Sequence, residues 1–310
     1  MNVKMTQESR LLPSPKEVGV SIVIPAYNEA GAVKREVGLV RDALRDTEWP
    51  FEVIVVDDGS DDRTAERAKS AGAHVLTHGA NKGYGAALKT GIRNARYGII
   101  CITDADGTYP PGAIPKLITI LEEEQSHMVV GSRTGPEAKI PWMRKPAKWI
   151  LARLAEMVVG ETIPDLNSGQ RTFRRKTVER FFNLLPDGFS FTTTITLAMA
   201  SNGYKITYDP ITYARRVGRS KIRPIRDTLG FIGLILRIAL YFAPLKIFLP
   251  LSGVLCLAAL VVGLVSSLIL GNLADVSTIV LVIAAVQVAV VGLVAELINR
   301  RVINVYLPDD

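Results

Sequence analysis

Two aspartates, Asp104 and Asp106, stand at the end of an apolar run of strand length that begins at Gly98. The chain then breaks at Gly107 and at the prolines shortly after it. An α/β sheet offers oxygen ligands to a hard cation in this way, by carrying acidic side chains from a strand into a loop. A divalent ion held there can neutralise a diphosphate. Because D-x-D is only a short pattern, its assignment as a cation site depends on the elements around it.

The segments around this run alternate between strands and helices. Short β-branched runs are typical of buried strands, and apolar residues at helical spacing are typical of covering helices. The predicted strands are 20–25, 51–56, 73–77 and the run from 98, and the predicted helices are 28–44, 62–71 and 86–95. This alternation indicates a mostly parallel sheet that is covered on both faces.

Three polar motifs follow three of these strands: Pro25–Glu29, Asp57-Asp58 and Asp104–Asp106. Taken singly, the first suits a helix start and the second a capped turn. The glycines of Asn81–Gly85 suit a loop better than a phosphate cradle. Ligands of such sheets bind beyond the carboxyl ends of the strands, so the joint order of the motifs predicts one shared site.

Two long stretches near the end of the chain, 247–270 and 276–295, contain no charged residue. Each meets the roughly 20-residue length that crosses a bilayer, and the short linker 271–275 forces an antiparallel hairpin. Two successive buried core helices of this length would be unusual. The sequence therefore predicts two transmembrane helices.

Basic residues predict the orientation of this hairpin. Lys246 precedes the first span, Arg300 and Arg301 follow the second, and the linker has no Lys or Arg. By the positive-inside rule we expect both termini in the cytoplasm and the protein in the cell's inner membrane. Residues 1–15 lack an apolar core, so no cleavable signal peptide is expected. Cys101 and Cys256, in a strand and a span, are not expected to pair.

Aromatic and basic side chains mix in 140–159, and a basic segment leads into an apolar one in 215–242. Both patterns favour amphipathic helices at a membrane interface. Basic residues there attract anionic headgroups by about 1 kcal/mol each. We expect lipid attraction from most of them and acceptor binding from a few. No nucleic-acid partner is expected, because a bilayer anchor accompanies the basic patch.

The motifs together resemble those of the GT-A glycosyltransferases of family 2. The resemblance runs from Ser21 to about Lys221, through Val23–Glu29, Val55–Ser60, Asn81–Gly83, Asp104–Gly107, Val130–Arg133, Asp165–Gly169 and Gly218–Lys221. The later motifs and the tail resemble the branch that makes polyprenyl-phosphate sugars. The implied fold class is α/β, with a Rossmann-like, mostly parallel GT-A catalytic domain. The expected order is an N-terminal tail (1–20), the catalytic domain (21–223), a juxtamembrane interfacial helix (224–245), and a transmembrane hairpin with a short cytoplasmic tail (246–310).

The resemblance also implies roles for single residues. The nucleotide sugar would contact Pro25, Tyr27, Glu29, Asp58, Lys82 and Asp104. Asp58 would read the base edge, with Asp57 as its structural neighbour. Asp106, with Asp104 beside it, would bind Mg²⁺ or Mn²⁺. Thr108 stands where several relatives have Gln, and Thr192–Thr194 has no acidic residue, so neither is assigned a catalytic role.

A phosphomonoester acceptor needs placement rather than a general base, because its second pKa is about 6 and it is mostly dianionic at neutral pH. Arginine binds such a group bidentately. The candidates are Arg133, Arg144 and Arg219, which with Asp104 and Asp106 form the predicted catalytic set; the resemblance adds Ser168 to the acceptor-phosphate contacts. The three histidines, His74, His78 and His127, lie at no motif and are expected at the surface.

The implied activity is inverting transfer of a hexose from a nucleotide sugar to a polyprenyl phosphate. UDP-hexose is favoured over GDP-mannose because the tail resembles the bacterial two-span enzymes. Two alternatives stay open: a family 2 enzyme with a soluble or glycan acceptor, and a non-catalytic nucleotide-sugar-binding membrane protein. Polymer synthesis is not expected, since no Q-x-x-R-W motif occurs. Gly253, Gly263 and Gly292 permit close helix approach and are compatible with a homo-oligomer.

Overall fold

A computed structural model describes residues 16–134, 156, 159–188, 190–214, 233, 239–240, 243–270 and 276–306. The chain divides into two compact units. The first comprises Met1–Ala138, Asn167–Thr192 and Lys205–Ser220, and the second comprises Lys139–Leu166, Thr193–Tyr204 and Lys221–Asp310. Each unit is considered by itself.

The first unit is built on a sheet whose order, within the described residues, is β3-β2-β1-β4-β6-β5-β7. Its strands are β1 (Lys16–Ala26), β2 (Phe51–Asp57), β3 (His74–Thr77), β4 (Tyr97–Ile102), β5 (Met128–Ser132), β6 (Arg171–Arg174) and β7 (Ile206–Pro210). All neighbouring pairs are parallel except those of β6, which runs antiparallel to β4 and β5. The predicted mostly parallel α/β sheet is confirmed.

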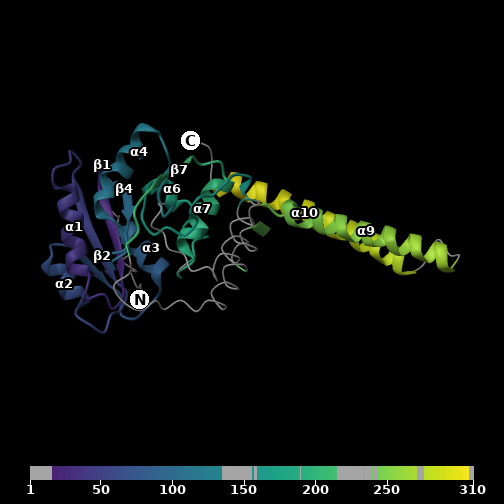
Figure 1. Cartoon of the computed structure of the whole chain (residues 1–310), viewed down its shortest axis with the longest axis horizontal. Helices are drawn as coiled ribbons and strands as arrows, with labels where there is room; N and C mark the ends of the chain where they lie inside the picture. The colour runs from purple at the N-terminus through teal and green to yellow at the C-terminus, as the bar shows by residue number, and fades with distance from the viewer. Residues whose placement is uncertain are drawn as a thin grey trace, which may run out of the picture. The chain divides into compact units, whose positions relative to one another are not determined.

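Helices cover this sheet on both faces (Figure 1). The helices and the 3-10 turn of this unit are α1 (Val33–Arg45), α2 (Thr64–Ser70), α3 (Tyr84–Asn94), η1 (Pro111–Ala113), α4 (Ile114–Glu123) and α6 (Arg175–Glu179). Apolar residues of α1, α2 and α4 join one core cluster with Val20, Ile22 and Ile24 of β1. Side chains alternate along a strand, so Val23 of β1 faces the opposite layer.

Helix α3 packs closely on that opposite face because Gly91 has no side chain. A Cβ at Gly91 would lie 2.3 Å from Val23 Cγ1 and 3.2 Å from Val56 Cγ2. The glycine therefore lets the C-terminal half of α3 pack directly against Val23 of β1 and Val56 of β2.

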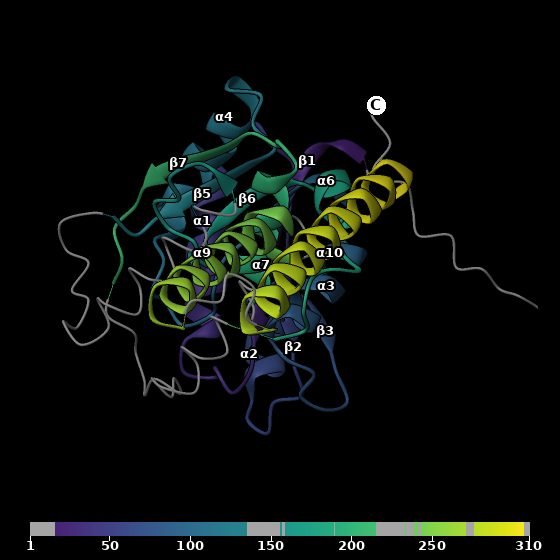
Figure 2. The same ribbon diagram turned by 90° about the vertical axis from the view of Figure 1, so that its right-hand side faces the viewer.

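The second unit contains α9 (Leu245–Leu270) and α10 (Val276–Tyr306), which lie side by side (Figure 2), and most of α7 (Phe191–Ser201). Within α9 and α10, Leu245–Leu268 and Val276–Ile298 are long and apolar enough to cross a membrane, with mean hydropathies of 2.5 and 2.7. Only 11% of the most apolar 18-residue stretch of each helix is buried. The two predicted spans thus exist as helices with exposed apolar surfaces. Most of the predicted interfacial segments, 140–159 and 215–242, lies outside the described residues.

Small residues bring the two helices of this hairpin together. A Cβ at Gly292 would lie 2.6 Å from Phe248 Cβ, and one at Gly263 would lie 3.2 Å from Thr278 Cγ2. The buried Ser252 hydroxyl donates a 2.8 Å hydrogen bond to the Ala285 carbonyl oxygen across the pair. Close approach of small residues and interhelical hydrogen bonds are how apolar helices associate in lipid.

These contacts give a matched test of the hairpin. Gly292→Leu should destabilise the helix pair by about 1–3 kcal/mol, since overpacking a close contact forces neighbours to move. Gly253→Leu, on the same hairpin, should be nearly neutral because nothing lies within 4 Å of a Cβ there. Thermal unfolding of the purified chain in detergent checks the pair. Equal losses in the two variants would contradict this packing.

Candidate active site

The carboxyl ends of β1, β2 and β4 meet at one edge of the sheet. In the strand register Ala26 pairs with Asp57, and Val23 pairs with Ile102. The Asp58 amide donates to the Ala26 carbonyl oxygen at 2.9 Å, which continues the pairing into the loop. The three polar motifs therefore follow adjacent strands, as the alternating pattern predicts.

The motif after β1 is fixed by the motif after β2. Asn28 adopts a left-handed conformation with φ of 57°. Its amide donates to Ser60 Oγ at 2.9 Å, and its Oδ1 accepts from the Asp61 amide at 2.9 Å. Asp57 accepts from the Ser60 amide at 3.2 Å and also from the Ser60 hydroxyl. Asp57 thus stabilises the loop after β2, which in turn fixes the loop after β1, in keeping with a structural role for Asp57.

This locked loop also explains a difference at the start of α1. The prediction began the helix at residue 28, whereas α1 begins at Val33. The left-handed Asn28 cannot continue a right-handed helix. In addition, the Glu29 amide donates to Thr64 Oγ1 at 2.9 Å instead of to a helical carbonyl. Pro25, Tyr27 and Glu29, the predicted nucleoside contacts, consequently lie at or just beyond the end of β1, where they border the edge of the sheet.

Asp58 organises the next loop. It is 3% exposed, its Oδ1 accepts from the Lys82 amide at 2.9 Å, and its Oδ2 accepts from the Gly83 amide at 2.8 Å. Gly83 has φ of 105°, and a Cβ there would lie 2.4 Å from the Asp187 carbonyl oxygen, so only glycine suits this position. The loop is thereby held with the Lys82 side chain exposed.

His78 belongs to this arrangement, and its expected surface position is wrong. The His78 side chain is 7% exposed, with Nδ1 2.6 Å from Asp58 Oδ1 and Nε2 2.9 Å from Thr90 Oγ1. The histidine joins the carboxylate after β2 to helix α3. In the sequence, only its position three residues before Asn81 of the Asn81–Gly85 motif indicates that His78 lies near this site. Of the other two histidines, His74 is exposed and His127 is half-buried.

Asp104 is half-buried and meets two groups from other parts of the first unit. The Tyr84 hydroxyl, at the start of α3, donates to Asp104 Oδ1 at 3.0 Å. Burial and then the Asp104 charge raise the pKa of Tyr84 well above its usual range, so Tyr84 stays a donor. A Cβ at Gly169 would lie 2.8 Å from Asp104 Oδ2. Tyr84 and Gly169 were not assigned this role from the sequence.

Asp106 is 7% exposed and is oriented by Thr108. Its Oδ1 accepts from the Thr108 hydroxyl at 2.7 Å and from the Thr108 amide at 3.2 Å, around Gly107 with φ of 73°. The Thr108 hydroxyl is therefore committed to Asp106.

The two aspartates fit a hard divalent cation. Carboxylate oxygens suit Mg²⁺ or Mn²⁺, and Mg²⁺ sites commonly use one or two carboxylates together with substrate phosphates and water. Within the described parts of the chain, no three His, Cys, Asp or Glu side chains could hold a metal ion together. A pair of carboxylates without a closed cage would suit an ion that also binds a diphosphate.

Arg133 stands at the end of β5 over an aromatic pair. Its guanidinium carbon lies 5.4 Å from the Tyr213 ring centroid. Tyr213 meets Tyr109 edge-on, with centroids 5.3 Å apart, and the Tyr109 hydroxyl accepts from the Gly169 amide at 2.6 Å. Successive contacts through Tyr213 and Tyr109 thus connect Arg133 to Gly169, which packs against Asp104. Arg144 and Arg219, the other predicted phosphate ligands, lie outside the described residues.

Ser168 is fully buried, and its hydroxyl donates to the Gly131 carbonyl oxygen at 2.5 Å. The predicted contact of Ser168 with the acceptor phosphate gains no support from this arrangement. The neighbouring Arg171 is also fully buried, and its Nε donates to the Ser168 carbonyl oxygen at 3.0 Å. These two side chains fix the segment that presents Gly169 to Asp104.

Gly169→Ala should lower sugar transfer about tenfold or more. The new Cβ would push the Asp104 carboxylate away, and misplacement of a catalytic group by as little as 1 Å can cost about 100-fold. Gly38→Ala is the control, because nothing lies within 4 Å of a Cβ at this position in α1. Initial rates with saturating donor measure the effect. Equal rates in both variants would show that Asp104 needs no such placement.

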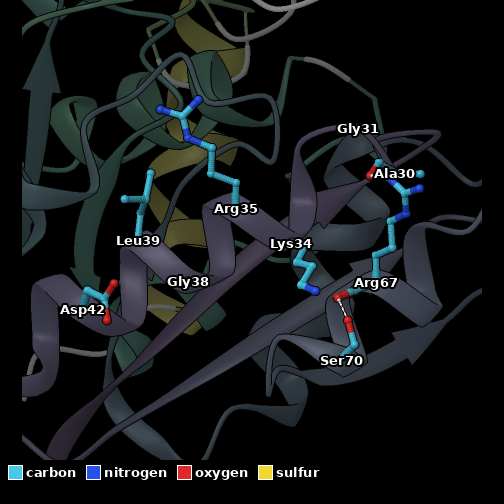
Figure 3. Close-up of a pocket in the computed structure, with 9 residues that line it drawn as sticks. All are labelled: Ala30, Gly31, Lys34, Arg35, Gly38, Leu39, Asp42, Arg67 and Ser70. Atoms are coloured by element: carbon cyan, nitrogen blue, oxygen red, sulfur yellow. Dashed lines mark hydrogen bonds between the residues drawn. The ribbon is translucent and has the colours of Figure 1, made fainter.

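A surface hollow of about 690 Å³ lies between α1 and α2 (Figure 3). It is lined by Ala30, Gly31, Lys34, Arg35, Gly38, Leu39, Asp42, Arg67 and Ser70. No predicted site residue lines it. Arg67 Nη1 donates to the Ala30 carbonyl oxygen at 2.6 Å, so one of its basic groups is used within the fold. The strand-end carboxylates, not this hollow, define the candidate site.

Comparison with known proteins places this sheet and its strand-end motifs in a class. Residues 21–182 match the model of the Glycosyl transferase family 2, and residues 243–300 match that of the GtrB C-terminal hairpin. The crystal structure of glucosyl-3-phosphoglycerate synthase from Mycobacterium tuberculosis with Mn²⁺, UDP and glucosyl-3-phosphoglycerate is similar in fold. Its TM-score is 0.57 at 22% identity, covering 72% of this chain and 80% of that one. The first unit is a GT-A glycosyltransferase fold.

Sequence relatives share the matched region. A dolichyl-phosphate hexose transferase of Haloferax volcanii is 32% identical over 206 residues, which is 66% of this chain and 87% of the relative. An undecaprenyl-phosphate mannosyltransferase of Micrococcus luteus is 30% identical over 217 residues, again 66% and 87%. The chain belongs to glycosyl transferase family 2.

Proposed function

We propose that this glycosyltransferase moves a hexose, with inversion, from a nucleotide sugar to a polyprenyl phosphate at the cytoplasmic face of the membrane. The observation that carries the proposal is one chain with both a strand-end carboxylate pair and a hairpin of exposed apolar helices. The two named relatives are polyprenyl-phosphate sugar transferases, which supports a lipid acceptor. Basic residues at the outer ends of the hairpin favour cytoplasmic termini.

The chemistry needs no general base on the protein. An oxygen of the acceptor phosphate dianion forms a bond to the anomeric carbon, while the bond from that carbon to the diphosphate breaks. The nucleoside diphosphate leaves with the electron pair. A divalent cation at Asp104 and Asp106 supplies Lewis-acid charge neutralisation for the diphosphate when bound. Arg133, with Arg144 and Arg219, orients the acceptor phosphate by charge-assisted hydrogen bonds.

Donor recognition falls to the loops after β1 and β2. Pro25, Tyr27 and Glu29 would border the nucleoside, and Lys82 would lie beside the nucleotide; the hydrogen bond from the Lys82 amide to Asp58 supports this role by fixing the loop. Asp104 would lie near the ribose and the cation, and the hydrogen bond from the Tyr84 hydroxyl would orient it there. UDP-hexose is the favoured donor, and a structural neighbour contains UDP.

The test is transfer of radiolabel from a panel of UDP- and GDP-hexoses into organic-extractable lipid. Membranes containing the protein are supplied with undecaprenyl or dolichyl phosphate, with and without EDTA. We expect one donor to label the lipid fraction, with the signal lost in EDTA and restored by excess Mg²⁺ or Mn²⁺. Binding of nucleotide sugar without any transfer would instead indicate a non-catalytic protein.

A further inference from the structure

Helix α1 contains one buried charged residue, Glu36, that the proposed mechanism does not use. Glu36 is 2% exposed and lies among the buried residues Val33, Val37, Val40 and Leu44. Its Oε1 has no hydrogen-bond partner among the residues that the structure describes. A buried polar atom without a partner costs about 1–3 kcal/mol, and more when it is charged. Such an atom needs a ligand or water to satisfy it.

Glu36 abuts the loop that carries Asp106. A Cβ at Gly107, the residue after Asp106, would lie 3.9 Å from Glu36 Oε2. Burial, followed by the charges of Asp106 and Asp104, raises the pKa of Glu36 to about 7, whereas Arg35 acts weakly in the opposite direction. Glu36 of α1 is therefore influenced by the negative charge of both aspartates in the loop after β4. Accumulated negative charge of this kind favours a cation.

Glu36 does not complete a three-carboxylate cage with Asp104 and Asp106 among the described residues. No three acidic, histidine or cysteine side chains in the described segments are close enough to share one ion. Mg²⁺ dehydrates reluctantly and keeps several of its waters when it binds a protein. Carboxylates outside the coordination shell accept hydrogen bonds from metal-bound ligands and tune the affinity of the site. The unpartnered Glu36 Oε1 is suited to that role.

We propose that Glu36 is an outer carboxylate of the cation site, where Oε1 accepts a hydrogen bond from a water bound to the divalent ion. This inference rests on the cation site of the proposed function. It adds a positioning residue from α1 to the two aspartates after β4. Neither the D-x-D motif nor its neighbours in sequence contains this residue.

Binding of Mn²⁺ tests the proposal without any use of enzymatic activity. The full chain in detergent is titrated with MnCl₂ at pH 8, and free Mn²⁺ is measured by electron paramagnetic resonance. The variants are Glu36→Gln, which removes the charge, Glu36→Asp, which withdraws the carboxylate by one methylene, and Asp106→Asn. Asp42→Asn is the matched control, since Asp42 is an exposed acid of the same helix. A cooperative thermal transition verifies that each variant is folded.

Loss of an outer-shell partner typically weakens metal binding 10–100-fold. Both Glu36 variants should therefore bind Mn²⁺ at least about tenfold more weakly, and Asp42→Asn should bind it as the wild type does. If either Glu36 variant keeps affinity within twofold of wild type while Asp106→Asn loses it, the role of Glu36 is overturned. If Asp106→Asn also keeps wild-type affinity, the cation site of the proposed function is itself wrong.

Discussion

Asp106→Asn is expected to lower hexose transfer at least about 100-fold. The Asp106 carboxylate is held in a defined orientation, because the Thr108 amide and hydroxyl both donate to its Oδ1. An asparagine keeps the Oδ1 that Thr108 contacts, so the turn is retained while the charge on the cation ligand is lost. Lewis-acid stabilisation of a leaving diphosphate is worth several kcal/mol, and 100-fold corresponds to about 2.7 kcal/mol.

The measurement is the initial rate of transfer into lipid at saturating donor, with MgCl₂ varied over a wide range. Asp42→Asn serves as the charge-matched control on an exposed part of α1. A shift of the metal requirement to higher concentration, together with a lower maximal rate, is the expected pattern. Unchanged transfer by Asp106→Asn would remove this residue from the catalytic set.

The second large effect concerns the stability of the cation-free protein. The pKa of Glu36 is about 7 in the fold, against 4.5 without the fold's influence. Between pH 4.5 and 7 the folded state therefore keeps a proton on Glu36 that the unfolded state has lost. The free energy of unfolding is greatest below pH 4.5 and falls as the pH rises through 7. A shift of this size corresponds to about 3 kcal/mol. Glu36→Gln carries no charge and should escape that loss.

In EDTA, Glu36→Gln should unfold at a temperature roughly 5–10 °C above wild type at pH 8, given the usual relation between free energy and melting temperature. At pH 4.5 the difference should largely disappear, because wild-type Glu36 is then neutral as well. Thermal melts of both proteins in detergent at the two pH values provide the comparison. A wild type that is more stable than the variant at pH 8 would reverse the sign and contradict the burial of an ionisable Glu36.

The parallel part of the sheet could be predicted because its strands are continuous β-branched runs. Predicted segments 51–56 and 73–77 coincide closely with β2 and β3, and the run from 98 with β4. The antiparallel strand β6 has no such signal. It is short, contains the fully buried Arg171, and is placed by contacts with the distant strands β4 and β5. Those contacts are not visible in local periodicity.

The sequence places Asp58, Asp104 and Asp106 just after strands, and the structure has all three in the loops that follow β2 and β4. The predicted site was incomplete where a side chain reaches it from another element. Tyr84 bonds to Asp104 from α3, and His78 bonds to Asp58 from the end of β3. The residue type of Glu36 gives no indication of burial, because charged residues on helices usually face solvent. Its spacing of three from Val33 and four from Val40 places it on the buried stripe of α1.

The acceptor is the central claim, and a pair of lipids that differ in one group tests it most directly. The purified chain in nanodiscs receives its labelled nucleotide sugar together with undecaprenyl phosphate, undecaprenol of the same chain length, or a water-soluble alcohol. We expect labelled lipid with the phosphate, identified by mass spectrometry as a sugar joined through phosphate, and none with either alcohol. Comparable transfer to undecaprenol or to the soluble alcohol would contradict the account.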